Sequence, residues 1–351
     1  MLNRVMLSAY LAAGLTGASA FPGTGRADPI ADFYKRTNLE IVVGSGVGGG
    51  YDAYARFLAR HISRHISGRP NVLVRNMPGA GGMVAGNFVY NQAPRDGSVI
   101  THLQNTLTID QLSGSSNISL DMRNFAWIGS MNTQATICVV GSHVEFDSAR
   151  DFLNKQFIIG ATAGIGNSTH MVPEILNALV GTKFKIIPGY TSTSDIVLGI
   201  ERKEVDGLCG WGWDSAQVQA AQAIDVGKLR VGIDIGNERH PDLEKRNVQF
   251  VMDLVREGVD KQALRLLLSP QDYGRPFAAP PGIPAARLAA LRSAFAATLQ
   301  DPAFLEDAKK ARLEINYAPP DKIAEAIRIA FDAAENVKER AIGLMAAARK
   351  K

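Results

Sequence analysis

The sequence has very little cysteine and no long apolar run beyond its N-terminus. Cys138 and Cys209 are the only two cysteines among 351 residues, and such a pair cannot alone supply the four ligands of a structural metal site. No run approaches the ~20 apolar residues that a membrane-spanning helix needs. With 46% hydrophobic and 21% charged residues, the composition is that of an ordinary globular protein, and 351 residues suffice for two domains.

Clustered charge and clustered histidine are also missing. The net charge is only +4, and the one short basic run is Arg349-Lys350-Lys351, so no nucleic-acid partner is expected. No histidine lies near acidic residues or cysteines at ligand spacing, so no metal is expected. Ser45 and Ser168 lie in glycine-rich loops, but neither has the G-x-S-x-G elbow of a serine hydrolase.

Residues 1–20 have the pattern of a secretory signal peptide. Arg4 gives the positive end, Val5 to Leu15 is mostly apolar, and Ala18-Ser19-Ala20 fits the small-x-small cleavage rule. We therefore expect an exported, soluble, periplasmic protein whose mature chain starts near Phe21. The alternative is a disordered cytoplasmic tail. Export permits a disulfide between the two cysteines without requiring one, so a bond and two buried thiols both remain open.

The segment from Glu40 to Asp96 organises the chain. Strand Ile41-Val42-Val43 breaks into a loop, Gly44 to Asp52, with five glycines in the seven residues 44–50. Each glycine loses more backbone entropy on folding than any other residue, so the run indicates a need for free backbone N–H groups and positive φ. A helix follows, with Asp52 as its predicted N-cap. A second strand, loop and helix repeat the pattern before a third strand at Val99-Ile100.

The same order of elements returns from Phe157 to Leu208, with little shared sequence. Such crossovers predict parallel strands with helices on the faces of the sheet. The predicted fold is α/β and two-lobed, like a periplasmic binding protein, and each lobe has a mostly parallel sheet. Residues 28–125 and 232–351 are predicted to form lobe 1, and residues 126–231 lobe 2. Loops from both lobes should line the cleft between them.

The first glycine loop has three interpretations. Gly44-x-Gly46-x-x-Gly49 satisfies the dinucleotide fingerprint. The second strand ends in Val74-Arg75-Asn76, however, without the acidic residue that holds a ribose, and Asp52 would repel a pyrophosphate. The glycines can also serve tight turns only. The third interpretation is an anion-binding solute receptor. It is favoured because two such loops follow adjacent strands and two more lie in the second half.

Five motifs resemble those of the Bug receptors, the TctC family of periplasmic substrate-binding receptors of tripartite tricarboxylate transporters. They are Gly48 to Arg56, Pro78-Gly79-Ala80-Gly81-Gly82, Pro94 to Gly97, Gly164 to His170, and the segment from Tyr190 to Asp206. The likeness covers essentially the whole mature chain. The family usually has Phe and Pro before the first glycines, and Lys or Arg with Gly after the Tyr. This chain has neither, so the sequence does not name the solute.

The resemblance implies a receptor that catalyses nothing, needs no cofactor, binds a carboxylated small molecule and delivers it to membrane permease subunits. We expect a monomer. An exported enzyme using the glycine loop for a nucleotide cofactor is the alternative. The four candidate loops contain no Lys or Arg, which predicts that main-chain donors hold the carboxylate, with Arg75 as the nearest cation. The predicted ligand-binding residues are Gly49, Gly50, Tyr51, Asp52, Gly79, Ala80, Gly81, Gly82, Asn105, Gly166, Asn167, Ser168, His170, Tyr190, Thr191, Ser192 and Thr193.

Overall fold

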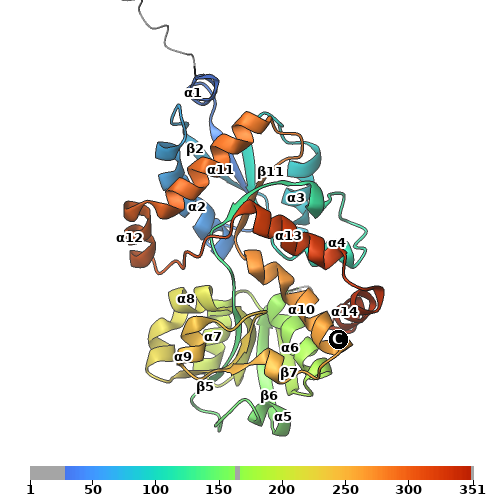
Figure 1. Ribbon diagram of the computed structural model, residues 1–351. Coiled ribbons are helices and arrows are strands. Elements are labelled where there is room, and N and C mark those ends of the chain that lie inside the picture. Colours follow the sequence, from blue (N-terminus) through green and yellow to red (C-terminus); the bar gives the residue numbers. More distant parts are fainter. Residues whose placement is uncertain (1–27, 163–166, 349–351) are drawn as a thin grey trace, which may run out of the picture.

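The chain folds into two lobes, each built around its own β-sheet, as the computed structural model in Figure 1 shows. The structure describes residues 28–162 and 167–348. The signal peptide predicted at 1–20 lies outside these residues. Both sheets are flanked by helices, so the predicted two-lobed α/β architecture is confirmed.

The sheet of lobe 1 has the order β2-β1-β3-β11-β4, in which β11 alone runs antiparallel to its neighbours. Ile41 and Val43 of β1 pack into the core on one face, and Val42 packs into the core on the other. A strand buried on both faces explains the continuous apolar run in the sequence. The strands are β1 (Leu39–Val43), β2 (Val72–Asn76), β3 (Val99–His102), β4 (Ala126–Ser130) and β11 (Pro276–Ala279).

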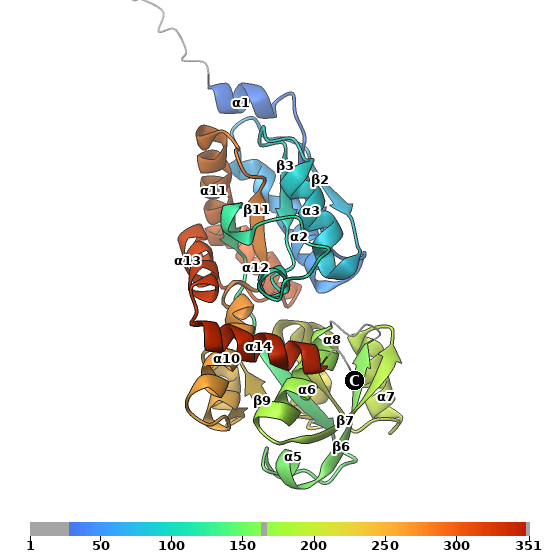
Figure 2. The ribbon, with the colours of Figure 1, turned by 90° about the vertical axis from the view of Figure 1, so that its right-hand side faces the viewer.

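Helices cover both faces of this sheet (Figures 1 and 2). They are α1 (Pro29–Tyr34), α2 (Gly50–Ile62), α3 (Met83–Asn91), α4 (Leu107–Leu112), α11 (Ala285–Gln300), α12 (Pro302–Lys310) and α13 (Pro320–Phe331), with short 3₁₀ turns η1 (Ser63–His65), η2 (Ala80–Gly82) and η3 (Met122–Asn124). The apolar residues between Leu313 and Tyr317 predict a short strand, but the segment forms none, and only an isolated bridge joins Ala318 to Ser130.

The sheet of lobe 2 has the order β10-β9-β5-β8-β6-β7, with β5 antiparallel to β8 and β9. Its strands are β5 (Thr136–Gly141), β6 (Gln156–Thr162), β7 (Lys183–Tyr190), β8 (Gly207–Gly212), β9 (Leu229–Ile235) and β10 (Gln249–Phe250). Its helices are α5 (Asp151–Asn154), α6 (Ser168–Leu179), α7 (Thr193–Glu201), α8 (Trp213–Asp225), α9 (Pro241–Lys245) and α10 (Val259–Leu268), with turns η4 (Val251–Asp253) and η5 (Ser269–Tyr273).

The two cysteines form a disulfide within this second sheet. Cys138 on β5 and Cys209 on β8 are paired residues of neighbouring antiparallel strands, with their Cα atoms 4.0 Å apart. Both are fully buried in the same core. Of the two possibilities left open by the sequence, the bond is the one that the structure contains.

The chain crosses between the lobes later than the sequence pattern indicated. Strand β4 belongs to the sheet of lobe 1, although residues 126–130 were expected in lobe 2. Strand β9 and helix α10 belong with lobe 2, so the chain returns through η5 and β11 rather than near residue 231. The reason is that an apolar run predicts a strand but does not say which sheet pairs with it.

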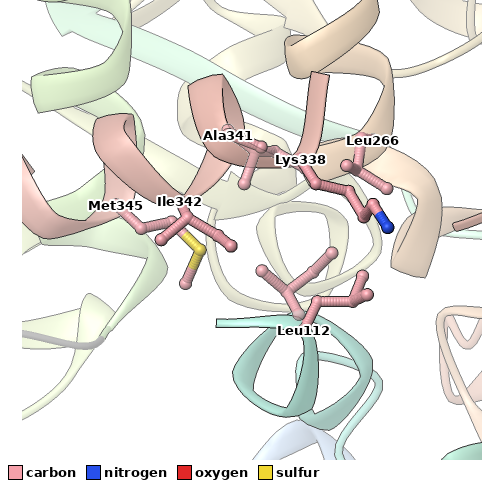
Figure 3. Close-up of a pocket in the computed structure, with 8 residues that line it drawn as sticks. Leu112, Leu266, Lys338, Ala341, Ile342 and Met345 are labelled. Carbon is pink, nitrogen blue, oxygen red and sulfur yellow. The ribbon is translucent and has the colours of Figure 1, made fainter. Parts of the chain in front are cut away.

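The C-terminal helical stretch also divides between the lobes. The Ala-rich pattern from Asp321 to Arg349 predicts one long helix closing over lobe 1. Instead, α13 packs against β4 of lobe 1, and α14 (Glu335–Ala348) packs against α6 and α10 of lobe 2. Figure 2 shows α14 lying along the lower lobe. Leu112 of α4 in lobe 1 contacts Leu266 of α10 and Ala341 and Met345 of α14 around a pocket of about 10 Å³ (Figure 3). This pocket is a packing contact between the lobes rather than a ligand site.

Candidate functional site

Three loops meet at the carboxyl edge of the lobe 1 sheet. They follow the parallel strands β1, β2 and β3, as expected for crossover connections. The loop after β1 touches the loop after β2, because a Cβ placed on Gly44 would stand 3.1 Å from the Cα of Gly82. The loop after β3 joins them, since a Cβ on Gly82 would overlap Gln104 at 2.3 Å. The first-lobe loops named from the sequence are thus brought together.

The Pro-Gly-Ala-Gly-Gly loop has four consecutive residues with positive φ. The φ values of Gly79, Ala80, Gly81 and Gly82 are 139°, 45°, 64° and 93°. Only the Gly82 N–H forms a backbone bond within this run, to the carbonyl oxygen of Gly79. Gly79, Ala80 and Gly81 are exposed. Exposed main-chain turns of this kind occur in the anion-binding concavities of proteins.

Asp52 holds the first glycine loop in place through hydrogen bonds. Its carboxylate accepts hydrogen bonds from the Gly48 N–H (2.9 Å), the Asn76 side chain (2.9 Å) and Arg56 (2.9 Å). The expectation that Asp52 is the N-cap of α2 is wrong, because Gly49 holds that place. Burial alone would raise the pKa of Asp52, but these hydrogen bonds outweigh it, and the pKa lies below its usual value. Asp52 is 2% exposed, and the hydrogen bonds described above are made to other residues of lobe 1.

The Asp52→Asn variant is expected to loosen this loop, because the amide keeps the shape but loses the charge that binds Arg56. We expect the free energy of unfolding to fall by about 1–2 kcal/mol at pH 7. A depressed carboxyl pKa stabilises the fold above the unfolded-state pKa of about 4 and loses that contribution as pH falls through the folded value. Urea denaturation should therefore show the difference from wild type shrinking below pH 4. Asp32→Asn on the exposed helix α1 is the control, and a difference that grows in acid would contradict this account.

Tyr51 and Asn105 connect lobe 1 to the returning crossing segment. The Tyr51 hydroxyl donates to Asn105 Oδ1 (2.9 Å) and lies 3.3 Å from the carbonyl oxygen of Gly274. The amide of Asn105 donates to the carbonyl oxygen of Pro270 (2.8 Å). Burial raises the pKa of Tyr51, so its hydroxyl stays protonated as a donor. Both predicted site residues therefore lie where the two lobes join.

The N-terminal end of α6 lies beside β8 in lobe 2. Asn167 caps α6, and its side chain accepts from the Thr169 N–H (3.1 Å). The Ser168 hydroxyl donates to the carbonyl oxygen of Gly210 on β8 (2.8 Å). His170 is 5% exposed, and its Nδ1 has no hydrogen-bond partner within the part of the chain described. The predicted contact Gly166 lies outside the described residues.

The hydroxyl groups after β7 are already engaged within lobe 2. Thr191 and Ser192 both donate to the carboxylate of Asp195, at the start of α7. Thr193 donates to Gln219 on α8 (2.9 Å). The ring of Tyr190 lies against Gly199 of α7. The sequence named these side chains as ligand donors, but in this structure they cap and pack the helices around them.

One pair of residues that was not predicted from the sequence connects lobe 1 to lobe 2. Arg275, just before β11, donates from Nη2 to Asp214 Oδ2 at 2.6 Å, and each side chain is 3% exposed. Asp214 lies in the first turn of helix α8, which directly follows β8. No local pattern marks either residue, since their meeting depends on where the crossing segment returns. Arg75, the cation expected nearest the site, instead pairs with Glu40 and lies over the Phe88 ring.

A larger cavity opens beside this pair. Its volume is about 690 Å³, and it separates α8 and α9 of lobe 2 from the end of α12 and the following segment of lobe 1. Asp214 and Trp213 line it on one side, and Arg312 and Glu314 on the other. Glu314 also bridges to His240 of lobe 2 at 3.1 Å. Of the predicted site residues that the structure describes, none lines this cavity. The cavity therefore enlarges the space between the lobes to one side of the predicted site.

The described helices include none with the length and apolar character needed to cross a membrane. Within the same residues, no group of three potential metal ligands gathers. At the end of β2, Asn76 is bound to Asp52 and to the carbonyl oxygen of Ser45. It thus serves the loop, where a dinucleotide enzyme would present an acidic residue to a ribose.

Two α/β lobes joined by crossing segments define a periplasmic solute-binding protein fold. The sequence matches the tripartite tricarboxylate transporter family receptor over residues 54–339, and the chain belongs to this family. A UPF0065 protein from the gbd 5′ region of Cupriavidus necator is 25% identical over 342 residues, which cover 94% of each chain.

Solved structures share the fold at low identity. The periplasmic binding protein BugD superposes with a TM-score of 0.64 at 21% identity, covering 89% of this chain and 98% of its own. MatC of Rhodopseudomonas palustris, solved with bound malate, gives 0.60 at 17% identity, with 88% and 99% covered. Another R. palustris protein, solved with adipate, gives 0.64 at 16% identity, with 88% and 98% covered.

Proposed function

We propose that this protein is a periplasmic receptor that binds a carboxylated small molecule between its lobes and delivers it to the permease subunits of a tripartite transporter. It acts as a monomer, catalyses no reaction and needs no cofactor. The observation that carries the proposal is the exposed backbone of residues 79–81, in a loop that packs against Gly44 at the start of the loop leading into α2. Family membership and the malate- and adipate-bound relatives support a carboxylate as the solute.

The site holds the charge chiefly through the main chain. The first turn of α2 begins at Gly50, and the glycines around it leave the N–H groups unobstructed. A helix N-terminus carries roughly half a positive charge, which favours a carboxylate. Asn167 and Ser168 at the start of α6 face the solute from the other lobe. Closure of the two lobes about the crossing segments then encloses the solute and shifts the population toward the closed state.

A thermal-shift screen tests this function. Aliphatic and aromatic mono- and dicarboxylates, with malate and adipate among them, should include acids that raise the melting temperature, because a ligand at 100 times its Kd adds about 2.7 kcal/mol of stability. Small-angle scattering with a stabilising acid should show a smaller radius of gyration. NAD and ATP serve as controls and should have no effect. Stabilisation by a nucleotide and by no acid would contradict the proposal and favour an exported enzyme.

Gly81→Val is expected to remove most of the affinity while the protein stays folded. No atom lies within 4 Å of a Cβ at Gly81, so the side chain fits, but the φ of +64° is strained for valine and the loop must change shape. We expect at least a tenfold rise in Kd by titration calorimetry, which corresponds to about 1.4 kcal/mol. Arg75→Ala is the matched control and should bind almost as wild type. If the control abolishes binding and Gly81→Val does not, main-chain recognition is wrong.

A further inference from the structure

Arg275 carries a charge into the place where both lobes meet. Its Nε and Nη2 atoms both donate to one oxygen of Asp214, Oδ2, at 3.2 and 2.6 Å. The other oxygen, Oδ1, accepts the backbone N–H of Ser215 at 2.7 Å. The backbone of Arg275 is held by lobe 1, where its N–H donates to the Ser130 hydroxyl (3.0 Å). The pair therefore links a lobe 1 backbone to the first turn of a lobe 2 helix.

The remaining edge of the guanidinium faces the first turn of α2. A Cβ placed on Gly50 would stand 3.0 Å from Nη2 and 3.4 Å from Nη1 of Arg275. Nη1 donates none of the hydrogen bonds found among the described residues, so one side of a nearly buried cation has donor capacity to spare. Gly50 itself is exposed, and the absence of a side chain there leaves this edge uncovered.

Two aromatic rings hold the guanidinium in this orientation. Its central carbon lies 4.7 Å from the centre of the Tyr51 ring and 4.9 Å from that of Tyr54. Both rings come from α2, so the cation moves with the helix whose N-terminus it faces. Cation–π contacts of this kind are strongest where water is excluded. The position of Arg275 relative to Gly50 is therefore fixed, whereas its contact with Asp214 depends on lobe 2.

We propose that Arg275 contacts the solute, its free edge binding a carboxylate at the first turn of α2, and that Asp214 lowers the affinity by sharing the guanidinium. The inference rests on the proposed function and adds a cation to a site otherwise built from main-chain donors. A planar guanidinium matches a carboxylate through parallel N–H groups, so it recognises the charge and not only the shape of the solute. Asp214 then determines how much of the positive charge of Arg275 is available to the solute.

The test compares acids with their neutral amides, which have nearly the same shape. Kd values for malate, adipate, malamide and adipamide are measured by calorimetry on wild type, Asp214→Asn and the double variant Asp214→Asn/Arg275→Gln. Asp214→Asn keeps an oxygen for Arg275 but removes the competing charge, and it should bind the acids at least ~10-fold more tightly. The double variant leaves a neutral Asn–Gln pair and should bind the acids at least ~10-fold more weakly than wild type. Amide binding should change little in either, and Arg75→Gln should leave the acid-to-amide ratio unchanged.

A purely structural role for the pair predicts a different outcome, in which the variants change acid and amide binding in parallel or not at all. Either result would overturn the proposal. If the double variant does not fold, Asp214→Asn alone decides, since it must favour acids over amides. If wild type binds no carboxylic acid, the proposed function fails instead. In that case acetate should still raise the melting temperature of Asp214→Asn more than acetamide does, and equal shifts would reject the role of Arg275.

Discussion

Removal of the Cys138–Cys209 disulfide should lower the free energy of unfolding of the protein by about 4 kcal/mol. The two cysteines are separated by 71 residues, and closing a loop of that length in the unfolded chain accounts for an effect of this size on the chain-entropy estimate. The double variant Cys138→Ala/Cys209→Ala avoids a free thiol. Urea denaturation of the oxidised wild type and the variant gives the difference directly.

Dithiothreitol provides the matched control for this prediction. Both sulfurs are fully buried in the lobe 2 core, so the reductant should act only on chains that have unfolded. It should therefore lower the urea midpoint of wild type toward that of the double variant and leave the variant unchanged. Equal midpoints for wild type with and without reductant, under equilibrium conditions, would mean that the bond contributes nothing to stability.

Gly210→Ala is expected to cost about 3 kcal/mol or more. Gly210 lies in β8 with a φ of +76°, and a Cβ there would stand 2.2 Å from the carbonyl oxygen of Ser168. Left-handed strain costs an alanine ~1–2 kcal/mol, and forcing the backbones apart adds ~1–3 kcal/mol. The displaced segment begins α6, so solute affinity should fall along with stability.

Gly181→Ala separates the two causes. Its φ of +82° is almost the same, but no atom lies within 4 Å of a Cβ at that position. We expect only the strain, about 1 kcal/mol, in chemical denaturation. If both variants are destabilised equally, the close approach of β8 to Ser168 has no energetic consequence.

The local chemistry of the sequence predicted the glycine loops and the strands before them. An apolar run such as Ile41-Val42-Val43 is interpreted as a strand when a turn and an amphipathic helix follow it, because the connection between strand and helix is then short. The apolar run from Leu229 to Ile235 also predicts a strand, but it does not predict the sheet to which that strand belongs. Pairing between distant segments depends on the packed core, and β9 and β4 carry no signal for the partner they choose. β11, an interior strand of lobe 1, likewise carries no local signal that it pairs with β3 and β4.

The candidate site divides in the same way. Residues of the first-lobe loops were found because glycine and positive φ are coupled within one loop. Thr191 and Ser192 were predicted as ligand-binding residues from their hydroxyl groups, and the sequence did not reveal that Asp195, three or four residues on, engages both hydroxyls at the start of α7. Arg275 and Asp214 were missed because their contact joins positions 61 residues apart through the return of the chain.

The placement of the last helix has a consequence for synthesis. Val337, Ala341 and Leu344 of α14 are part of the same buried core as Phe157 and Cys138. Lobe 1 is also completed late, since β11 is inserted between β3 and β4. Lobe 1 cannot complete its sheet before β11 has been synthesised, and lobe 2 cannot complete its core before α14 has been synthesised, although domains with local contacts fold as they emerge from the ribosome. For a chain that we propose is exported, this delay would keep the precursor able to pass through a translocation channel until these two elements have been added.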